Sequence, residues 1–200
     1  MINVTNSKEQ ILHTALKLFL KNSYKDVSLR DIVNEVGLTK GAFYHYYESK
    51  EKLFEDTVKH FYNNMIIADY KSFPKTSLKE FYEFYLKKLQ EPDEFDELDD
   101  DMNLFIFISE ASKRLPAFQQ IHNAHHQKEI WEWSKIIETA KRKKEIKTFI
   151  PNEELACMFL NLSDGALVQR TTTNKTGAES LTDIKRDWDN LYNLLKVNKR

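Results

Sequence analysis

The chain of 200 residues contains only four glycines, four prolines and one cysteine. Turn-forming residues this sparse argue against an all-β fold, which needs a turn between each pair of short strands. The single Cys157 cannot form a disulfide within the chain, and its apolar surroundings favour a place in the core. The chain is 41% hydrophobic, which is too apolar for a disordered protein. A mostly helical globular fold is predicted.

Long apolar segments and a strong net charge are also missing. The longest unbroken apolar run, Leu104 to Ile108, is too short to span a bilayer, and the start of the chain lacks the basic and apolar regions of a signal peptide. We therefore expect a cytoplasmic protein with no membrane partner. The formal charge is −1, but residues 1–52 carry eight Lys or Arg against six Asp or Glu. This weak asymmetry has the sign expected of a nucleic-acid-binding N-terminus.

Apolar residues recur at helical spacing along most of the chain. They predict an all-α fold of about nine helices, over residues 8–20, 29–36, 40–47, 50–70, 78–90, 102–114, 116–146, 153–170 and 180–196. The predicted N-caps are Ser7, Ser28, Thr39, Ser49 and Asn152. Gly37 is predicted to end the second helix, where a positive φ would be tolerated. The acidic run of residues 91–101 is predicted to be a solvated loop.

The second and third predicted helices are short and are joined by a turn that contains a glycine. Two such helices behind a longer first helix are typical of a helix-turn-helix, whose second helix enters the DNA major groove. The helical period places Phe43 and Tyr47 on the inward face of this helix, with Lys40 and Tyr44 on the opposite face. A plain helical hairpin with no DNA partner is the alternative that this spacing leaves open.

The residue types on the outer face suit contact with DNA. Gly41 has no side chain, so the backbone can approach the duplex closely. Lys40 can reach a guanine edge or a phosphate, and Ala42 can lie against a thymine methyl. Lys50 begins the next helix, where its charge and a free backbone N–H could meet a phosphate.

The segment "VSLRDIVNEVGLTKGAFYHYYESKEKLF", residues 27–54, resembles the DNA-binding domain of TetR-family transcriptional regulators over its whole length. The resemblance implies a ligand-responsive regulator, typically a repressor, that binds an inverted-repeat operator in double-stranded DNA as a homodimer. By resemblance the DNA contacts fall on Ser28, Thr39, Lys40, Gly41, Tyr44, His45, Tyr46 and Lys50. This chain departs from the family at Tyr46-Tyr47, where a His-Phe pair is common, and at Ser23, where a glycine is usual after the first helix.

We assign residues 1–49 to the helix-turn-helix domain and 50–200 to a helical domain for effector binding and dimerisation. "FISEASKRLPAF" and "NEELACMFLNLSDGALVQR" look like helices of TetR-family C-terminal domains. By that analogy the last two helices form the dimer interface, through Leu155, Phe159, Leu162, Leu181, Ile184, Trp188, Leu191 and Leu195. Core packing within one chain is the alternative role for these side chains.

A pocket for a small apolar or aromatic effector would draw on the aromatic and apolar residues of the middle helices. The candidates are Phe61, Phe81, Phe84, Tyr85, Phe105, Ile108, Trp131 and Met158. For each of them taken singly, an ordinary place in the core is the favoured role, and a ligand contact is the alternative. Nothing in the sequence identifies the effector, the operator or the regulated genes.

Two clusters raise the competing hypothesis of a helical metal-binding protein or enzyme that keeps the helix-turn-helix as a scaffold. His122 and His126 stand four residues apart beside His125, a spacing that can chelate a transition metal, but no HExxH pattern or cysteine pair accompanies them. The acidic run lacks the glycine and ligand spacing of a calcium loop. With no P-loop, GxSxG or nucleotide-binding glycine motif present, we expect no enzyme, no cofactor and no metal. A regulator that answers a partner protein is a third possibility.

Overall fold

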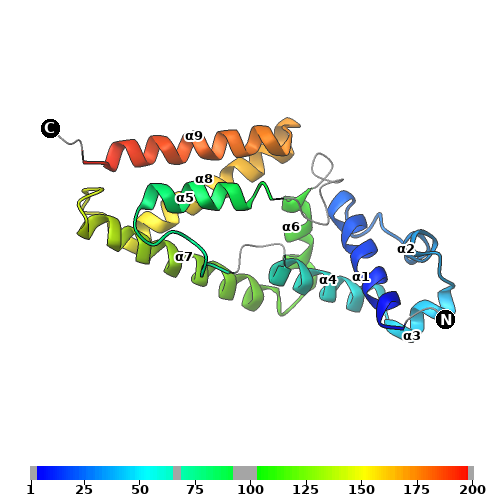
Figure 1. Ribbon diagram of the computed structural model, residues 1–200. Coiled ribbons are helices and arrows are strands. Elements are labelled where there is room, and N and C mark those ends of the chain that lie inside the picture. The colour runs from blue at the N-terminus through cyan, green and yellow to red at the C-terminus, as the bar shows by residue number, and fades with distance from the viewer. Residues whose placement is uncertain (1–3, 65–68, 92–102, 198–200) are drawn as a thin grey trace. The chain divides into compact units, whose positions relative to one another are not determined.

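The computed structural model describes residues 4–64, 69–91 and 103–197, with side chains from Ser7 onward. In these residues every regular element is an α-helix, and no strand is formed (Figure 1). The predicted all-α fold is confirmed. None of the described helices combines the length and the apolar composition that a membrane crossing requires.

Nine helices lie in the described part of the chain. Their bounds are α1 Val4–Lys21, α2 Leu29–Val36, α3 Lys40–Tyr46, α4 Lys50–Asn64, α5 Leu78–Lys88, α6 Leu104–Arg114, α7 Phe118–Arg142, α8 Asn152–Thr173 and α9 Gly177–Leu195. The chain divides into two compact units: residues 1–66 with 94–122, and residues 67–93 with 123–200. These units are defined by packing, so the assignment of DNA binding to residues 1–49 and effector binding to 50–200 stays a prediction.

The first unit contains α1, α2, α3, α4, α6 and the first residues of α7. Helix α1 packs against α2, α4 and α6. Its Phe19 meets Phe54 of α4 edge to face at 4.9 Å, and Phe54 meets Phe107 of α6 in the same way at 5.6 Å. The backbone N–H of Asn103 also donates to the Leu20 carbonyl at 2.8 Å. Helix α6, which follows α1 by more than eighty residues, therefore completes the core beneath the helix-turn-helix.

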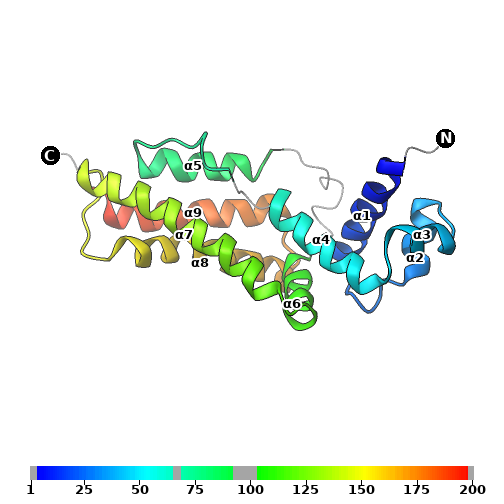
Figure 2. The same cartoon turned by 90° about the horizontal axis from the view of Figure 1, so that it is seen from below.

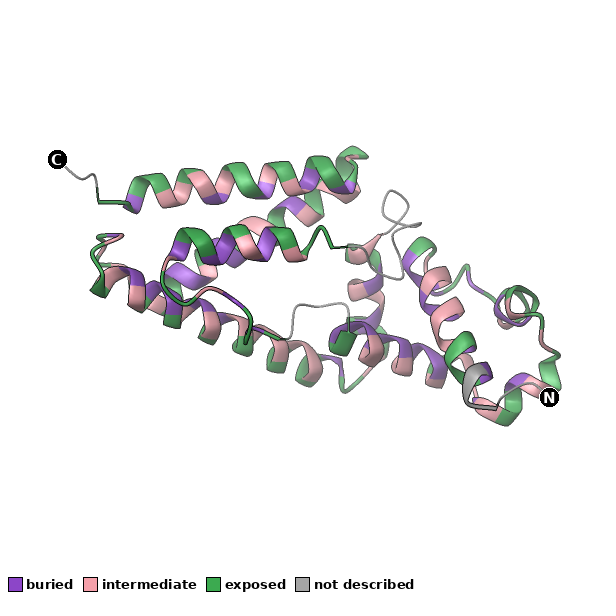
Figure 3. Cartoon of the chain, in the orientation of Figure 1, coloured by how far each residue is buried: buried purple, intermediate pink, exposed green. Residues whose placement is uncertain are grey.

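The second unit contains α5, most of α7, α8 and α9. Helices α8 and α9 pack side by side, and α5 packs against α9 (Figure 2). The buried faces of these helices meet in a core around two fully buried indoles, Trp133 and Trp188, whose rings lie 5.0 Å apart (Figure 3). The Trp188 Nε1–H donates to the Phe159 carbonyl at 2.7 Å, so this polar group is satisfied inside the core. One isolated antiparallel β-bridge pairs Ile146, which lies between α7 and α8, with Lys196, which follows α9.

Two predicted N-caps are wrong. Helix α1 already begins at Val4, so Ser7 lies inside it, where it is only 2% exposed. Helix α8 begins at Asn152 with Pro151 as its N-cap, so Asn152 is the first helical residue and not the cap. The fixed φ of a proline is compatible with an extended residue at this position.

The ends of three helices, α4, α7 and α9, also differ from the prediction. Helix α4 ends at Asn64 and not at Tyr70, which is buried outside any helix, and α7 covers 118–142 and not 116–146. Helix α9 begins at Gly177, three residues before the predicted start, because Thr176 and Glu179 form a complete capping box there. Most of the acidic run, residues 92–101, lies outside the described residues.

Candidate nucleic-acid interface

The turn between α2 and α3 is built from local hydrogen bonds that the sequence encodes. The Ser28 hydroxyl accepts from the Asp31 N–H, and the Asp31 carboxylate accepts from the Ser28 N–H, which closes a capping box at the start of α2. Gly37 ends α2 with φ +74°, and its N–H donates to carbonyls at the end of the helix. The Thr39 hydroxyl then caps α3 by accepting from the Ala42 N–H at 3.2 Å. These three predicted features are confirmed, and together they set the angle between the two helices.

Aromatic packing fixes the rotation of α3 about its own axis. Phe43 is fully buried and Tyr47 is 3% exposed, with ring centroids 5.9 Å apart. Burial raises the pKa of the Tyr47 hydroxyl to about 12. The predicted inward face is therefore confirmed, and the opposite face of α3 is presented to solvent.

The outer face carries most of the residues predicted to contact DNA. Ser28, Thr39, Lys40, Gly41, Tyr44 and His45 are exposed, and Tyr46 is half-buried. The Lys40 ammonium lies 5.9 Å from the centre of the Tyr44 ring, which is 49% exposed. These residues share one exposed strip of the first unit, and this placement is compatible with contact to DNA. The contacts themselves stay a prediction.

Gly41 is not required by the packing of the protein itself. A Cβ added at this position would meet only the Thr39 hydroxyl, at 4.0 Å, so an alanine would fit without any clash. Glycine within a helix costs stability relative to alanine. A reason for it outside the chain, such as the close approach of a DNA backbone, is consistent with this free space.

A hollow of about 410 Å³ lies where α3 gives way to α4. Tyr44, His45 and Tyr46 line it from the predicted set. Sequence reasoning did not include its other lining residues, which are Lys8, Tyr47, Glu48, Lys52 and Asp56. Lys8 and Lys52 add positive charge beside the recognition helix. Lys8 is exposed and Lys52 is half-buried, and neither position carried a distinguishing signal in the sequence.

Lys50 is placed differently from the other predicted contacts. Its ammonium donates to the carbonyls of Tyr24 and Val27, both at 2.8 Å, and lies 3.9 Å from the centre of the Tyr24 ring. Burial lowers the pKa of this ammonium. The side chain thus ties the start of α4 to the loop between α1 and α2. Its backbone N–H at the start of α4 is the group that remains for a phosphate.

Tyr24, which the Lys50 side chain contacts, also contacts further parts of the first unit. The Tyr24 hydroxyl donates to the Glu51 carboxylate at 2.9 Å, and its ring stacks on Phe19 at 5.6 Å. The guanidinium of Arg114, at the end of α6, lies 4.2 Å from the centre of the same ring. The loop that leads into the helix-turn-helix is therefore held by α4 and α6 together, which no sequence motif indicates.

The residues predicted to form an effector pocket do not gather around one cavity. Phe61, Phe81 and Tyr85 are buried in the cores, and Phe84 and Ile108 pack against those cores half-buried. Phe105, Trp131 and Met158 are exposed. The hollow beside α3 and the hollow beside the turn between α8 and α9 are lined by other residues. The role of the eight predicted residues in effector binding stays a prediction.

The residues predicted to form the dimer interface lie largely inside the core of the second unit. Leu155, Phe159, Ile184, Trp188 and Leu195 are buried within the single chain. Leu162, Leu181 and Leu191 pack against the same core and are half-buried. All eight residues therefore pack within the single chain, which is the alternative role that the sequence left open. Their part in dimerisation stays a prediction.

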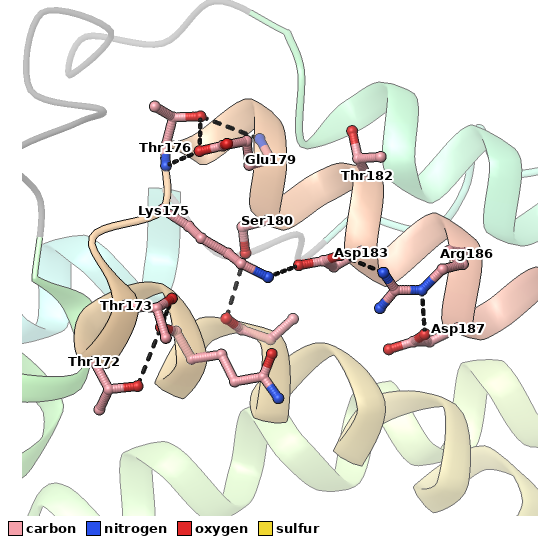
Figure 4. Close-up of polar contacts among 12 residues, drawn as sticks. Thr172, Thr173, Lys175, Thr176, Glu179, Ser180, Thr182, Asp183, Arg186 and Asp187 are labelled. Carbon is pink, nitrogen blue, oxygen red and sulfur yellow. Dashed lines mark hydrogen bonds and ion pairs between the residues drawn. The ribbon is translucent and has the colours of Figure 1, made fainter.

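The second hollow, of about 330 Å³, lies beside the turn between α8 and α9 (Figure 4). Lys175 forms an ion pair across it with Asp183, and Arg186 binds the same carboxylate at 2.7 Å. Hydrogen bonding by Lys175 lowers the pKa of Asp183. Its charged groups are thus already paired with each other, which fits a solvated surface better than a binding site.

His122 of α7 takes part in the packing of the first unit. The ring of His122 stacks on Phe118 at 5.6 Å, and its Nδ1 lies 3.0 Å from the Tyr62 hydroxyl. Within the described residues, no group of three or more His, Cys, Asp or Glu is placed to hold a metal ion. The competing metal-binding hypothesis gains no support from this geometry.

A capped helical pair with an exposed second helix defines the first unit as a helix-turn-helix DNA-binding module. Residues 11–57 match the model of the family described as bacterial regulatory proteins, tetR family. These residues therefore form a DNA-binding domain of the kind found in TetR-family helix-turn-helix transcriptional regulators. Its α2, turn and α3 all fall inside the matched residues.

Comparison with individual proteins agrees with this assignment. IcaR of Staphylococcus aureus, a negative transcriptional regulator of the biofilm operon icaADBC, is 24% identical over 95% of this chain and 97% of its own length. The HTH-type regulator YuxN of Bacillus subtilis is 42% identical over 53 residues, and this match spans 26% of the present chain but only 18% of YuxN.

Solved structures show the same fold. A TetR-family regulator from Agrobacterium tumefaciens superposes with a TM-score of 0.73 at 15% identity, over 98% of this chain and 100% of that one. A second from Cytophaga hutchinsonii gives a TM-score of 0.72 at 17% identity, over 100% and 99% of the two chains. At such identities the likeness concerns the fold alone.

Proposed function

We propose that this protein is a transcriptional repressor that binds an inverted-repeat operator as a homodimer and is released by a small-molecule effector. The observation that carries the proposal is the exposed face of α3, held outward by the buried Phe43 and Tyr47. The regulation attributed to IcaR, which is negative, supports repression over activation. We place the protein in the cytoplasm, where its DNA would be.

The proposed contacts divide into reading and positioning groups. Gly41 and Tyr44 lie near the start and middle of α3 and are proposed to face the base edges, whereas Lys40 beside them is proposed to reach a phosphate. Ser28, Thr39, His45 and Tyr46 are proposed to contact phosphates, as is the backbone N–H of Lys50. Because the hydroxyls of Ser28 and Thr39 accept hydrogen bonds as helix caps, their own hydrogens stay available to donate to a phosphate.

The homodimer would place two copies of α3 about one turn of DNA apart, roughly 34 Å. An effector that binds more tightly to a conformer with a different separation would then weaken operator binding. The shift can be no larger than the difference between the effector's affinities for the two conformers. Helix α4 is the proposed lever, because Leu53, Phe54 and Val58 anchor it in the core of the first unit.

Selection of bound sequences from random double-stranded DNA tests the proposal. We expect an inverted repeat to be enriched and two chains to bind each selected site. Replacement of Lys40 by Ala should weaken binding to all sequences and lower the slope of log affinity against log salt by about one per subunit. Replacement of Tyr44 by Ala should in addition relax the preference at specific base pairs.

A matched control is Lys71→Ala, which removes an exposed lysine from the second unit and should leave both readouts unchanged. Failure to enrich any sequence would contradict the assignment of operator binding. So would a selected site that both α3 variants bind as tightly as the parent protein does.

A further inference from the structure

The connection between α7 and α8 is held against two other helices of the second unit. The Glu145 carboxylate accepts a hydrogen bond from the Leu78 N–H at the start of α5, at 3.0 Å, and another from the Tyr192 hydroxyl of α9, at 3.2 Å. The Lys147 N–H donates to the Leu195 carbonyl at 2.9 Å. The connection therefore lies beside the start of α5 and the end of α9, at one end of the second unit (Figure 1).

Three large apolar side chains are exposed at this end. Phe149 is 100% exposed, Leu194 is 83% exposed and Val197 is 42% exposed. The bridge between Ile146 and Lys196 brings the connection that carries Phe149 beside the segment that carries the other two. Single exposed apolar side chains are ordinary, but several at one end of a folded unit indicate a contact surface.

Basic side chains lie around these apolar groups. The Lys143 ammonium donates to the Thr76 carbonyl at 3.1 Å, which brings the residues before α5 to the same end. The exposed basic residues there are Lys75, Arg142, Lys143, Lys144, Lys147 and Lys196. Within the described residues, none of them forms an ion pair. Their positive charge therefore faces the solvent.

Acidic side chains do not cancel this charge. Glu145, the acid within the connection, is occupied by its hydrogen bonds to α5 and α9. The exposed acids nearest in the sequence are Glu80, Glu138, Glu153 and Glu154. All but Glu138 lie in the first turns of α5 and α8, where the partial positive charge of the helix N-terminus compensates them. The basic groups around Phe149 keep a net attraction for anions.

Protruding apolar groups surrounded by cations suit one kind of partner best. An anionic lipid bilayer offers negative headgroups to the cations and, just beneath them, an apolar region for an aromatic side chain. A DNA backbone would pair with the cations but leave the Phe149 ring in water. The same patch of a second copy would bring like charges together, which opposes association.

We propose that this basic-apolar patch, formed by Phe149, Leu194 and Val197 with the six basic residues around them, docks the protein on the surface of an anionic lipid bilayer. Phe149 and Leu194 enter the interfacial region, and the basic side chains contact the headgroups. The inference goes beyond the proposed function. It departs from the expectation of no membrane partner, which rested on the lack of a spanning segment, because docking on a surface needs none.

Co-sedimentation of the full-length protein with lipid vesicles tests the patch. The protein should bind vesicles of phosphatidylglycerol mixed with phosphatidylcholine, more weakly as salt is raised, and should not bind phosphatidylcholine alone. Phe149→Ser should weaken binding about tenfold, because the inserted ring is lost. Arg142→Gln combined with Lys147→Gln should weaken binding about tenfold or more. Melting curves should not change, since all three positions are exposed.

Matched controls remove the same kinds of side chain elsewhere. Trp131→Ser removes an exposed aromatic from α7, and Lys71→Gln combined with Lys87→Gln removes two exposed charges of the second unit outside the patch. Lys40→Ala removes a charge from the proposed DNA-binding face. All of these variants should bind the vesicles as the parent does.

Three results would overturn the proposal. The first is that the parent does not bind the anionic vesicles, or that both patch variants bind them as tightly as it does. The second is that only the charge variant weakens binding, because the contact would then be a general attraction to anions that DNA or an acidic protein also offers. The third is that Phe149→Ser changes the mass in sedimentation equilibrium and not the vesicle binding, since the patch would then join two copies of the chain.

Discussion

The ammonium of Lys50 makes three contacts with the loop between α1 and α2: two carbonyls and the Tyr24 ring. Hydrogen bonds from a charged donor in a partly buried site are each worth more than neutral ones. We expect Lys50→Met to lower the free energy of unfolding by about 1–2 kcal/mol, because both carbonyls lose their donor. Chemical denaturation measures this change.

Lys52→Met is the matched control, because Lys52 stands two positions further along α4 and pairs only with Glu55 and Asp56 at the surface. Surface pairs of this kind contribute about 0–1 kcal/mol. The salt dependence of DNA binding separates the two roles of Lys50. If the side chain of Lys50 only holds the loop between α1 and α2, Lys50→Met should leave the salt slope unchanged. If the side chain contacts a phosphate, Lys50→Met should lower the slope by about one. A lowered slope with unchanged stability would contradict the structural role.

At the scale of elements, two glycines of the helix-turn-helix should respond to alanine in opposite ways. Gly37 has φ +74°, where any Cβ is strained, so Gly37→Ala should destabilise the protein by about 1 kcal/mol or more. Gly41 has helical geometry and free space, so Gly41→Ala should leave stability unchanged or raise it by up to about 1 kcal/mol. Gly41→Ala should nevertheless weaken operator binding. Equal stability losses in both variants would contradict this division.

The capping boxes of α2 and α9 predict a dependence of stability on pH. Hydrogen bonds from Ser28 lower the pKa of the Asp31 carboxyl, and hydrogen bonds from Thr176 lower that of Glu179. Since each folded pKa lies below the unfolded value, these caps contribute fully above about pH 4 and are lost as the pH falls through the folded value. Asp31→Asn should therefore melt below the parent at neutral pH and approach it in acid.

Melting curves recorded from neutral pH down to strong acid check this expectation. Glu35→Gln, an exposed substitution in α2 outside the capping box, serves as the control and should follow the parent throughout. A constant difference between Asp31→Asn and the parent at every pH would contradict the assigned role of the carboxylate.

The elements that the sequence predicts well are those whose ends are fixed by neighbouring residues. Ser28, Gly37 and Thr39 form their hydrogen bonds within one turn of chain, so the bounds of α2 and the start of α3 could be read directly. The capping box of Thr176 was equally local and could have been found. The end of α4 was less readable, because the apolar spacing continues past Asn64 up to Tyr70.

Features that depend on long-range packing could not be predicted. The contact of Arg114 with Tyr24 joins residues ninety positions apart, and the place of α6 beside α1 follows from such contacts alone. The aromatic residues around Glu129 look like any core cluster in the sequence. Only the structure shows that this acid accepts hydrogen bonds from two tyrosine hydroxyls.

At the scale of the whole molecule, the proposed homodimer raises the question of which surface would join its two chains. Leu155, Phe159 and Trp188 are buried in the core of one chain, and their part in dimerisation stays a prediction. Helix α8 keeps another face open: Met158 and Val168 are both 41% exposed, and a Cβ on Gly165 between them would meet nothing within 4 Å. Spacings of seven and three residues place the three on one helical face.

A small residue in the middle of an exposed apolar face allows a second helix to approach closely. We therefore expect Val168→Lys to dissociate the homodimer into folded monomers, since a partly exposed position tolerates a lysine in the free chain. Trp188→Ala should instead unfold the second unit, at a cost of about 3–5 kcal/mol. Sedimentation equilibrium gives the mass of each variant, and melting curves report its fold.

Loss of the dimer should weaken binding to a full inverted repeat far more than binding to a half-site. In a dimer, once one subunit has bound its half-site, the second subunit is held at a high effective concentration near the other half-site. Gln169→Lys places the same charge on the neighbouring exposed position of α8 and controls for charge alone. If Val168→Lys stays dimeric with unchanged operator affinity, the open face of α8 is not the interface, and the contact must be sought on the exposed side of α9 around Leu194, which is 83% exposed.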